Sequence, residues 1–175
     1  MPARLIFLVS KQSQQLLDSQ VIQPIAPKHA QDLQGWLAAV ANNLHDTFPN
    51  LKLAYYSSRT YGGYAQGLSL TNPEPYAYES GFSVQWLMTA QIGGDASLNF
   101  DPQKGAVRAP WLSWGPYLWA DGMNPRCDGL IWECSDFNDA DGTHLTPQGR
   151  AKVVKLMLDF LKTDGTARQW YLAKP

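Results

Sequence analysis

Apolar residues in the first fifty positions follow two patterns, one typical of a buried strand and one typical of a helix. The segment Arg4 to Val9 is a continuous apolar run with Ile and Val, which predicts a strand buried on both faces, as in a parallel sheet. A helix is expected to begin near Pro27, since proline suits the first helical turn, and to end before Pro49. Its apolar stripe has spacings of four, three and four residues and consists of Leu33, Leu37, Val40 and Leu44.

The middle of the chain indicates two more strands and one more helix. Leu51 to Tyr56 predicts a second strand, and Gly129 to Trp132 predicts a short third one. Tyr78 to Ile92 predicts a helix, although Gly81 weakens it by about 1 kcal/mol relative to alanine. The stretch 93–124 is rich in turn residues and is longer than an ordinary connection, which favours a functional loop. The residues of this helix that are expected to point inward are Phe82, Trp86 and Leu87.

A capped helix completes the pattern. Thr146 is a suitable N-cap, with Pro147 at the first helical position. The order strand, helix, strand, helix, strand, helix, without internal repeats, predicts an α/β fold with a parallel sheet and right-handed crossovers. A length of 175 residues fits one domain, residues 1–175, with one core. The apolar stripe of the last helix consists of Val153, Val154, Met157, Leu158 and Leu161.

Composition narrows the class of protein. Apolar residues make up 45% of the chain and charged residues 17%, as in a folded domain rather than a disordered segment. With 14 basic and 15 acidic residues and no run of Lys or Arg, the chain is not expected to bind nucleic acid. No apolar run reaches the ~18 residues of a membrane span, so we expect a soluble protein without a membrane partner. The sequence does not indicate the cellular compartment.

Metal and cofactor signals are weak. Cys127 and Cys134 form one pair without a second pair or nearby histidines, which disfavours zinc and leaves a local disulfide open. A calcium loop starting at Asp136 would place Ala140 at its fifth position and Pro147 at its twelfth, which rules out the EF-hand pattern. The sequence therefore predicts no metal and no cofactor. A glycosidase pair of carboxylates, Glu79 and Glu133, would depend on a spacing that only the fold determines.

The clearest chemical signal is the motif Asp141-Gly142-Thr143-His144, between a predicted strand and the capped helix. An aspartate three residues before a histidine can hold its carboxylate against one imidazole nitrogen. The other nitrogen can then take a proton from a hydroxyl group. This spacing predicts the general base and the orienting carboxylate of a serine triad, His144 and Asp141. The alternative is an ordinary turn with an exposed histidine.

The segment Asp136 to Arg150, with this motif and its helix start, resembles the last motif of the SGNH (GDSL-type) ester hydrolases. Pro49 to Arg59 is similar to the fourth strand of that family, and Arg4 to Ser10 would then be the third. The resemblance implies a flavodoxin-like three-layer fold with strand order 2-1-3-4-5, apparently lacking its first two strands in a chain that begins mid-fold. It also implies a serine-type ester hydrolase in which His144 is the general base.

The serine and glycine motifs of the family are not found in this chain, and its Gly-x-Asn position reads Ser10-Lys11-Gln12. The side-chain amide of Gln12 is a candidate oxyanion donor. Ser58 and Arg59, at the end of the second strand, are candidates for oxyanion or substrate contacts. Ser10 and Ser58 are alternative nucleophiles, or hydroxyls that satisfy turn backbone. If the central strand is missing, Leu5 to Val9 becomes an edge through which the chain self-associates.

Aromatic residues make up 12% of the chain, and five of its seven tryptophans lie between Trp86 and Trp132. Aromatic faces stack on sugars, so this density predicts a carbohydrate cleft, with packing in a loop-rich core as the alternative. The function indicated is hydrolysis of an ester, that of an acylated carbohydrate if the cleft binds sugar. The alternative is a non-catalytic carbohydrate-binding or interaction module of the same fold. The candidate cleft residues are Trp111, Trp114, Tyr117 and Trp119.

Overall fold

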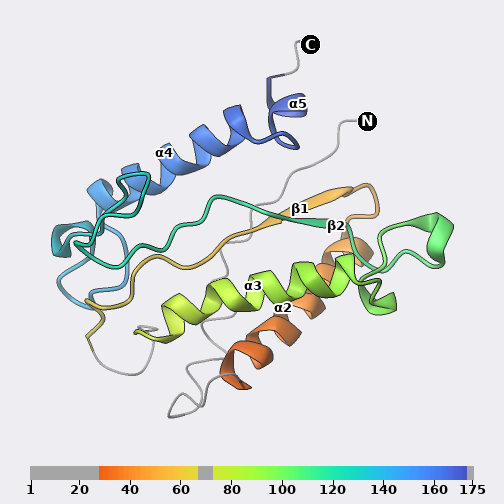
Figure 1. Ribbon diagram of the computed structural model, residues 1–175, viewed down its shortest axis with the longest axis horizontal. Helices are drawn as coiled ribbons and strands as arrows, with labels where there is room; N and C mark the ends of the chain where they lie inside the picture. Colours follow the sequence, from red (N-terminus) through yellow and green to blue (C-terminus); the bar gives the residue numbers. More distant parts are fainter. Residues whose placement is uncertain (1–27, 67–72, 173–175) are drawn as a thin grey trace.

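The computed structural model describes residues 28–66 and 73–172. In this part of the chain, three long helices flank a two-stranded parallel sheet (Figure 1). The helices are α2 (Lys28–Thr47), α3 (Tyr76–Ile92), α4 (Pro147–Thr163) and the short α5 (Arg168–Tyr171). The strands are β1 (Leu53–Tyr56) and β2 (Trp111–Trp114), and single 3-10 turns lie at η1 (Ala96–Leu98), η2 (Pro102–Lys104) and η3 (Cys134–Asp136).

Both faces of the sheet are covered. The strands pair in parallel with Leu53 opposite Trp111, and α3 forms the crossover between them. Side chains alternate along β1, so that Ala54 and Tyr56 pack with α2 and α3 while Tyr55 packs with the C-terminal helices. Figure 1 shows α2 and α3 on one side of the strands and α4 on the other. An apolar strand without polar alternation is what this double coverage requires.

The larger core lies between α2, α3 and the sheet. The predicted helix stripe is confirmed in α2, where Leu33, Leu37 and Leu44 are buried, and the helix ends before Pro49 as expected. Burial of each such side chain contributes about 1.5–3 kcal/mol. The hydroxyl group of Ser83, on α3, donates to the carbonyl of Ala30 at 2.8 Å and joins the two helices.

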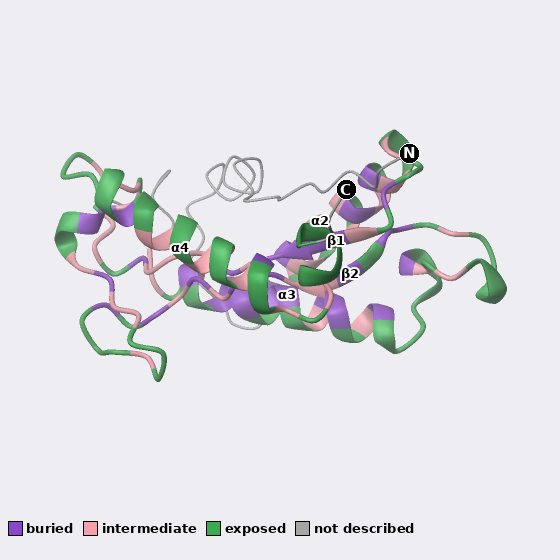
Figure 2. Cartoon of the chain, turned by 90° about the horizontal axis from the view of Figure 1, so that it is seen from above, coloured by how far each residue is buried: buried purple, intermediate pink, exposed green. Residues whose placement is uncertain are grey.

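The helix α4 begins as predicted but covers its face of the sheet thinly. The Thr146 hydroxyl accepts a hydrogen bond from the backbone N–H of Gly149. Leu161 is buried against Tyr55, which also meets Phe160 edge to face at 5.0 Å. Figure 2 shows most of α4 as exposed or intermediate. The predicted stripe is therefore only partly in contact with the core, and its exposed members are Val154 and Leu158.

The third predicted strand is wrong. Residues 129–132 are irregular, and the second described strand is β2, inside the segment expected to be a loop. The fully buried Trp132 makes hydrogen bonds to loop carbonyls instead of ladder bonds, from its backbone N–H to Gly122 and from its indole to Leu118. The residues around Trp132 are apolar because they are buried in a core formed by loops, and not because they belong to a paired strand.

The α/β class is shown only as a small parallel sheet with helices on both sides. The predicted strand Arg4 to Val9, with its expected self-associating edge, lies outside the described residues, as do Ser10 and Gln12. The larger three-layer sheet of the SGNH type stays a prediction.

Two apolar residues of α3, one buried and one exposed, allow a matched test of the core. Leu87 is 0% exposed at the centre of the main core, whereas Ile92 is 83% exposed at the end of the same helix. We expect Leu87→Ala to lower the free energy of unfolding by about 2–5 kcal/mol, because it leaves a cavity. Ile92→Ala should change it by less than about 0.5 kcal/mol. Urea unfolding of both variants measures this, and equal losses would contradict the described packing.

Candidate active site

The predicted contact between Asp141 and His144 is confirmed. Oδ2 of Asp141 lies 2.6 Å from Nδ1 of His144. The other oxygen, Oδ1, accepts hydrogen bonds from the backbone N–H groups of Thr143 and His144 at 2.8 and 2.9 Å. Because an ionised carboxylate only accepts, the neutral imidazole carries its proton on Nδ1, and Nε2 is left as the acceptor.

The electrostatics of the pair suit an ionised aspartate beside an accessible histidine. Burial acts to raise the pKa of Asp141, but the N–H groups of His144 and Thr143 and the imidazole together hold this pKa below its ordinary value. The side chain of Asp141 is 27% exposed and that of His144 is 59% exposed. The imidazole therefore remains open to a substrate from the solvent side.

The loop that carries the pair is held from two sides. Gly142 has a φ of +63°, and a Cβ there would lie 1.8 Å from the carbonyl oxygen of Tyr64, so only glycine fits. Phe137 and Leu145 form an antiparallel bridge across the loop. The backbone N–H of Gln66 donates to the carbonyl of Asp141 at 2.9 Å. The geometry of the pair thus depends on the segment 62–66 as well as on its own turn.

A buried ion pair lies beneath this loop. Asp136 is fully buried, and its Oδ2 accepts from Lys152 Nζ at 2.5 Å and from the backbone N–H of Glu133 at 2.8 Å. Its backbone carbonyl accepts from Thr146 at 2.9 Å, at the start of α4. Lys152 also donates to the carbonyl of Ile131. These bonds fasten both ends of the segment that carries the Asp141–His144 pair to α4.

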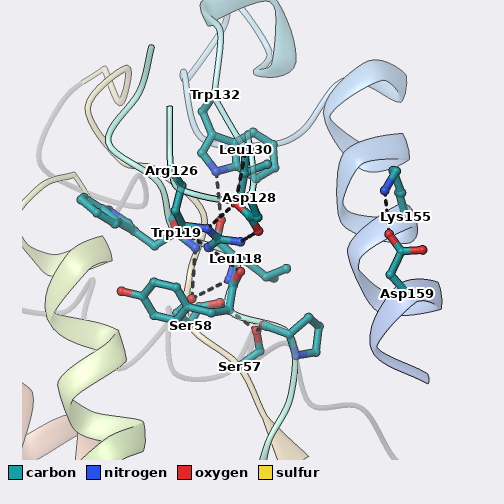
Figure 3. A network of polar contacts seen from close by, with 12 residues as sticks. Ser57, Ser58, Leu118, Trp119, Arg126, Asp128, Leu130, Trp132, Lys155 and Asp159 are labelled. Atoms are coloured by element: carbon teal, nitrogen blue, oxygen red, sulfur yellow. Dashed lines mark hydrogen bonds and ion pairs between the residues drawn. The ribbon is translucent and has the colours of Figure 1, made fainter. Parts of the chain in front are cut away.

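The structure gives Ser58 a backbone-supporting role. The Ser58 side chain is buried, and its hydroxyl oxygen accepts from the backbone N–H groups of Leu118 and Trp119 at 2.9 and 3.2 Å (Figure 3). The described contacts of this hydroxyl do not include His144. The backbone N–H of Arg59 donates to the hydroxyl of Ser80 at 2.9 Å. The alternative interpretation, a hydroxyl that satisfies turn backbone, describes Ser58 best.

Glu74 organises the neighbouring loops and was not identified from the sequence. Its Oε1 accepts from the backbone N–H of Gly62 and from the indole of Trp119, both at 2.8 Å. Its Oε2 accepts from the backbone N–H of Tyr78 at 3.0 Å, in the first turn of α3. An acidic residue four positions before the predicted helix start at Tyr78 was the available signal, because such residues favour helix N-termini. Gly62 and Trp119 are distant from Glu74 in the sequence, so the residues around Glu74 did not indicate these partners.

Arg126 supports the same loops from the other side. Its Nη1 donates to the backbone carbonyls of Tyr117 and Trp119, both at 2.8 Å. Its Nε and Nη2 donate to the two oxygens of Asp128 at 2.9 and 2.6 Å (Figure 3). The hydrogen bonds from Arg126 lower the pKa of Asp128 to about 2. Arg126 therefore serves as a structural brace in the described structure.

The four aromatic residues predicted to line a cleft do not all lie together in the structure. Trp114 and Tyr117 line a groove of about 400 Å³ against α3, together with Tyr78, Gly81, Phe82 and Gln85. The Trp119 ring lies beside this groove, 4.7 Å from that of Tyr78. Trp111 instead stacks with Phe100 at 6.4 Å. Phe82, expected to point inward, lies in the groove and is 37% exposed.

The described residues give little support to the other kinds of site considered from the sequence. Cys127 and Cys134 are free and exposed, and residues 28–66 and 73–172 contain no His, Cys, Asp and Glu cluster that could hold a metal ion. Glu79 pairs with His29, whereas Glu133 lies 3.5 Å from Lys152. No helix in these two ranges is both long and apolar enough to cross a membrane. Comparisons of the chain with protein-family models, curated proteins and solved structures found no match.

Substitutions of two lysines on α4 test the ion pair between Asp136 and Lys152. Lys152→Met should lower the free energy of unfolding by about 3–5 kcal/mol, because it leaves the buried carboxylate of Asp136 without its counter-charge. Lys155 forms an exposed pair with Asp159 one turn along the helix (Figure 3). Lys155→Met should therefore leave the free energy of unfolding almost unchanged. Urea unfolding at neutral pH compares the two, and similar values would argue against the anchoring role of Asp136.

The Arg126–Asp128 brace predicts a pH dependence. The pKa of Asp128 in the folded protein, about 2, lies below its ordinary value of 3.8. The stabilisation is therefore complete above the ordinary pKa and is lost as pH falls through the folded value. We expect the difference in unfolding free energy between the protein and Asp128→Asn to be constant above about pH 5 and to shrink toward pH 2. Unfolding curves at several pH values measure it. A difference that persists unchanged at low pH would disprove the prediction.

Proposed function

We propose that the protein is a serine-type ester hydrolase of the SGNH class, in which His144 is the general base and Asp141 orients it. The observation that carries this proposal is the Asp141–His144 contact of 2.6 Å on Nδ1, with the imidazole 59% exposed. In the turn, both oxygens of Asp141 are engaged, so its carboxylate is fixed in position before a substrate arrives.

The proposed chemistry follows from which atoms can exchange a proton. Nε2 of His144 takes the proton of a serine hydroxyl as its oxygen attacks the ester carbonyl carbon. The carboxylate of Asp141 stabilises the imidazolium that forms. The same proton then passes from Nε2 to the departing alcohol, which leaves an acyl-enzyme. Attack by water, again with His144 as base, releases the acid and restores the serine.

The finer fold belongs to the same proposal. In the SGNH order, β1 and β2 would be the fourth and fifth strands, and the expected third strand, Arg4 to Val9, lies outside the described residues. The parallel pairing of β1 with β2 through α3, and the placement of α4 on the opposite face, support this assignment. The Asp141–His144 pair directly precedes α4, as the resemblance implies. The nucleophile in this proposal is a serine other than Ser58, since the Ser58 hydroxyl is occupied by backbone N–H groups.

A second function is favoured by one observation. The Ser58 hydroxyl serves the backbone while an aromatic groove is present, which is the arrangement expected of a carbohydrate-binding module that has no nucleophile. In that case the Asp141–His144 pair would be a structural turn. The two functions differ in whether a serine reacts.

Covalent labelling with a fluorophosphonate separates the two. The 175-residue chain and, where the reading frame continues upstream of Met1, the extended protein are treated with the probe. We expect labelling only in the extended protein, and its loss on His144→Ala, because the serine then has no base. His45→Ala, on α2, is the matched control and should label normally.

The other outcomes are decisive as well. Labelling of the 175-residue chain that disappears with Ser58→Ala or Ser10→Ala, while the thermal melt is retained, would show a different nucleophile. If the extended protein does not react, or if no extension exists and the chain does not react, the hydrolase is excluded and the binding module is favoured.

A further inference from the structure

The groove between α3 and the 114–117 segment depends on a glycine in the middle of a helix. A Cβ at Gly81 would lie 3.2 Å from the ring of Tyr117, which rests on α3 at this point. Glycine in a helix costs about 1 kcal/mol relative to alanine. Its presence allows an aromatic ring to approach the helix backbone and form the floor of the groove.

The lining of the groove is aromatic and open. Tyr78 and Phe82 are 41% and 37% exposed and meet edge to face at 5.3 Å. Trp114 and Tyr117 meet at 6.1 Å with their planes 72° apart. The volume of about 400 Å³ is within the range of about 300–1,000 Å³ typical of small-molecule sites. Ring faces in such an open groove are available for stacking.

Polar groups accompany these rings. Burial raises the pKa of Tyr117, so its phenol stays neutral and can donate a hydrogen bond. The side-chain amide of Gln85 and the hydroxyl of Tyr78 belong to the same lining. Among the residues that the structure describes, no aliphatic side chain lines the groove. An acyl chain prefers an enclosed aliphatic surface, whereas a sugar offers an apolar face to aromatic rings and hydroxyls to polar groups.

The groove is supported by the loops that hold the candidate active site. Glu74 fixes Trp119 beside the groove and also binds the backbone of Gly62. The segment that begins at Gly62 reaches Asp141 through the backbone N–H of Gln66. The hydrogen bonds of Glu74 and Gln66, joined by the backbone of residues 62–66, thus link Trp119 beside the groove to the Asp141–His144 loop. A ligand held by aromatic rings on such a preorganised frame loses little affinity to reordering.

We propose that this groove binds a sugar unit of a carbohydrate, and that this carbohydrate is the alcohol part of the ester on which His144 acts. The second clause rests on the proposed hydrolase function, whereas the first does not. The rings of Phe82 and Tyr78 stack on the sugar, and Gln85 and Tyr117 bond its hydroxyl groups.

Affinity electrophoresis tests the binding. The full chain is run in native gels with and without soluble xylan, arabinan, mannan or β-glucan, and retardation reports binding. We expect at least one polymer to retard the protein, and Phe82→Ala to weaken this binding about tenfold through the lost stacking. Phe100→Ala is the matched control, because Phe100 is 42% exposed but lies outside the groove, and it should leave retardation unchanged.

The outcomes distinguish this inference from the hydrolase proposal. His144→Ala should bind as the unmodified chain does. Binding together with absence of fluorophosphonate labelling in the extended protein, or in the chain where no extension exists, would support the groove and reject the hydrolase. Absence of retardation by every polymer, or an equal loss in Phe82→Ala and Phe100→Ala, would overturn the inference while leaving His144-dependent labelling to stand. Quenching of tryptophan fluorescence by octanoate that Phe82→Ala abolishes would overturn it in favour of an acyl-chain site.

Discussion

The buried carboxylate of Asp136 is the constraint on which the candidate active site depends. A charge inside the protein is costly unless it is paired and hydrogen-bonded, and Lys152 on α4 supplies the pairing. The backbone carbonyl of the same residue holds Thr146, which caps α4. The segment between these points has little freedom relative to the helix. Asp141 and His144 lie on that segment. The ion pair between Asp136 and Lys152 therefore positions them, although it takes no part in the proposed chemistry.

A second set of contacts, the hydrogen bonds made by Glu74 and Arg126, holds the loops between the proposed base and the aromatic groove. Glu74 collects donors from the 62–66 segment, from α3 and from the indole of Trp119. Arg126 holds the carbonyls of the facing loop. Charged groups in both cases bond mainly to backbone and indole N–H or carbonyl groups, which fixes loops that have little regular structure of their own. The proposed sugar site and the proposed base are therefore two parts of one loop assembly.

Local patterns predicted the long helices and the strand β1, but they placed a strand at residues 129–132 and missed β2. The spacing of Leu33, Leu37 and Leu44 identifies a helix face, because 3.6 residues per turn repeats over many positions. A four-residue strand offers no such repetition. Apolar and aromatic residues fill both β2 and the segment near Trp132, and only hydrogen-bond partners distinguish a strand from a buried loop. Phe82 likewise looked like a core residue, since its exposure depends on a groove formed by a distant segment.

The amino-acid sequence by itself determined what depends on neighbours a few residues away: the helix ranges, the Thr146 cap, and the contact of Asp141 with His144, which a three-residue spacing brings about within one turn. The tertiary structure decided everything that depends on distant partners. These features include the pairing of Asp136 with Lys152, the loops gathered by Glu74, the occupied hydroxyl of Ser58 and the division of the aromatic candidates. The physical reason is that such contacts form only when chain closure brings remote segments together, and no local spacing encodes them.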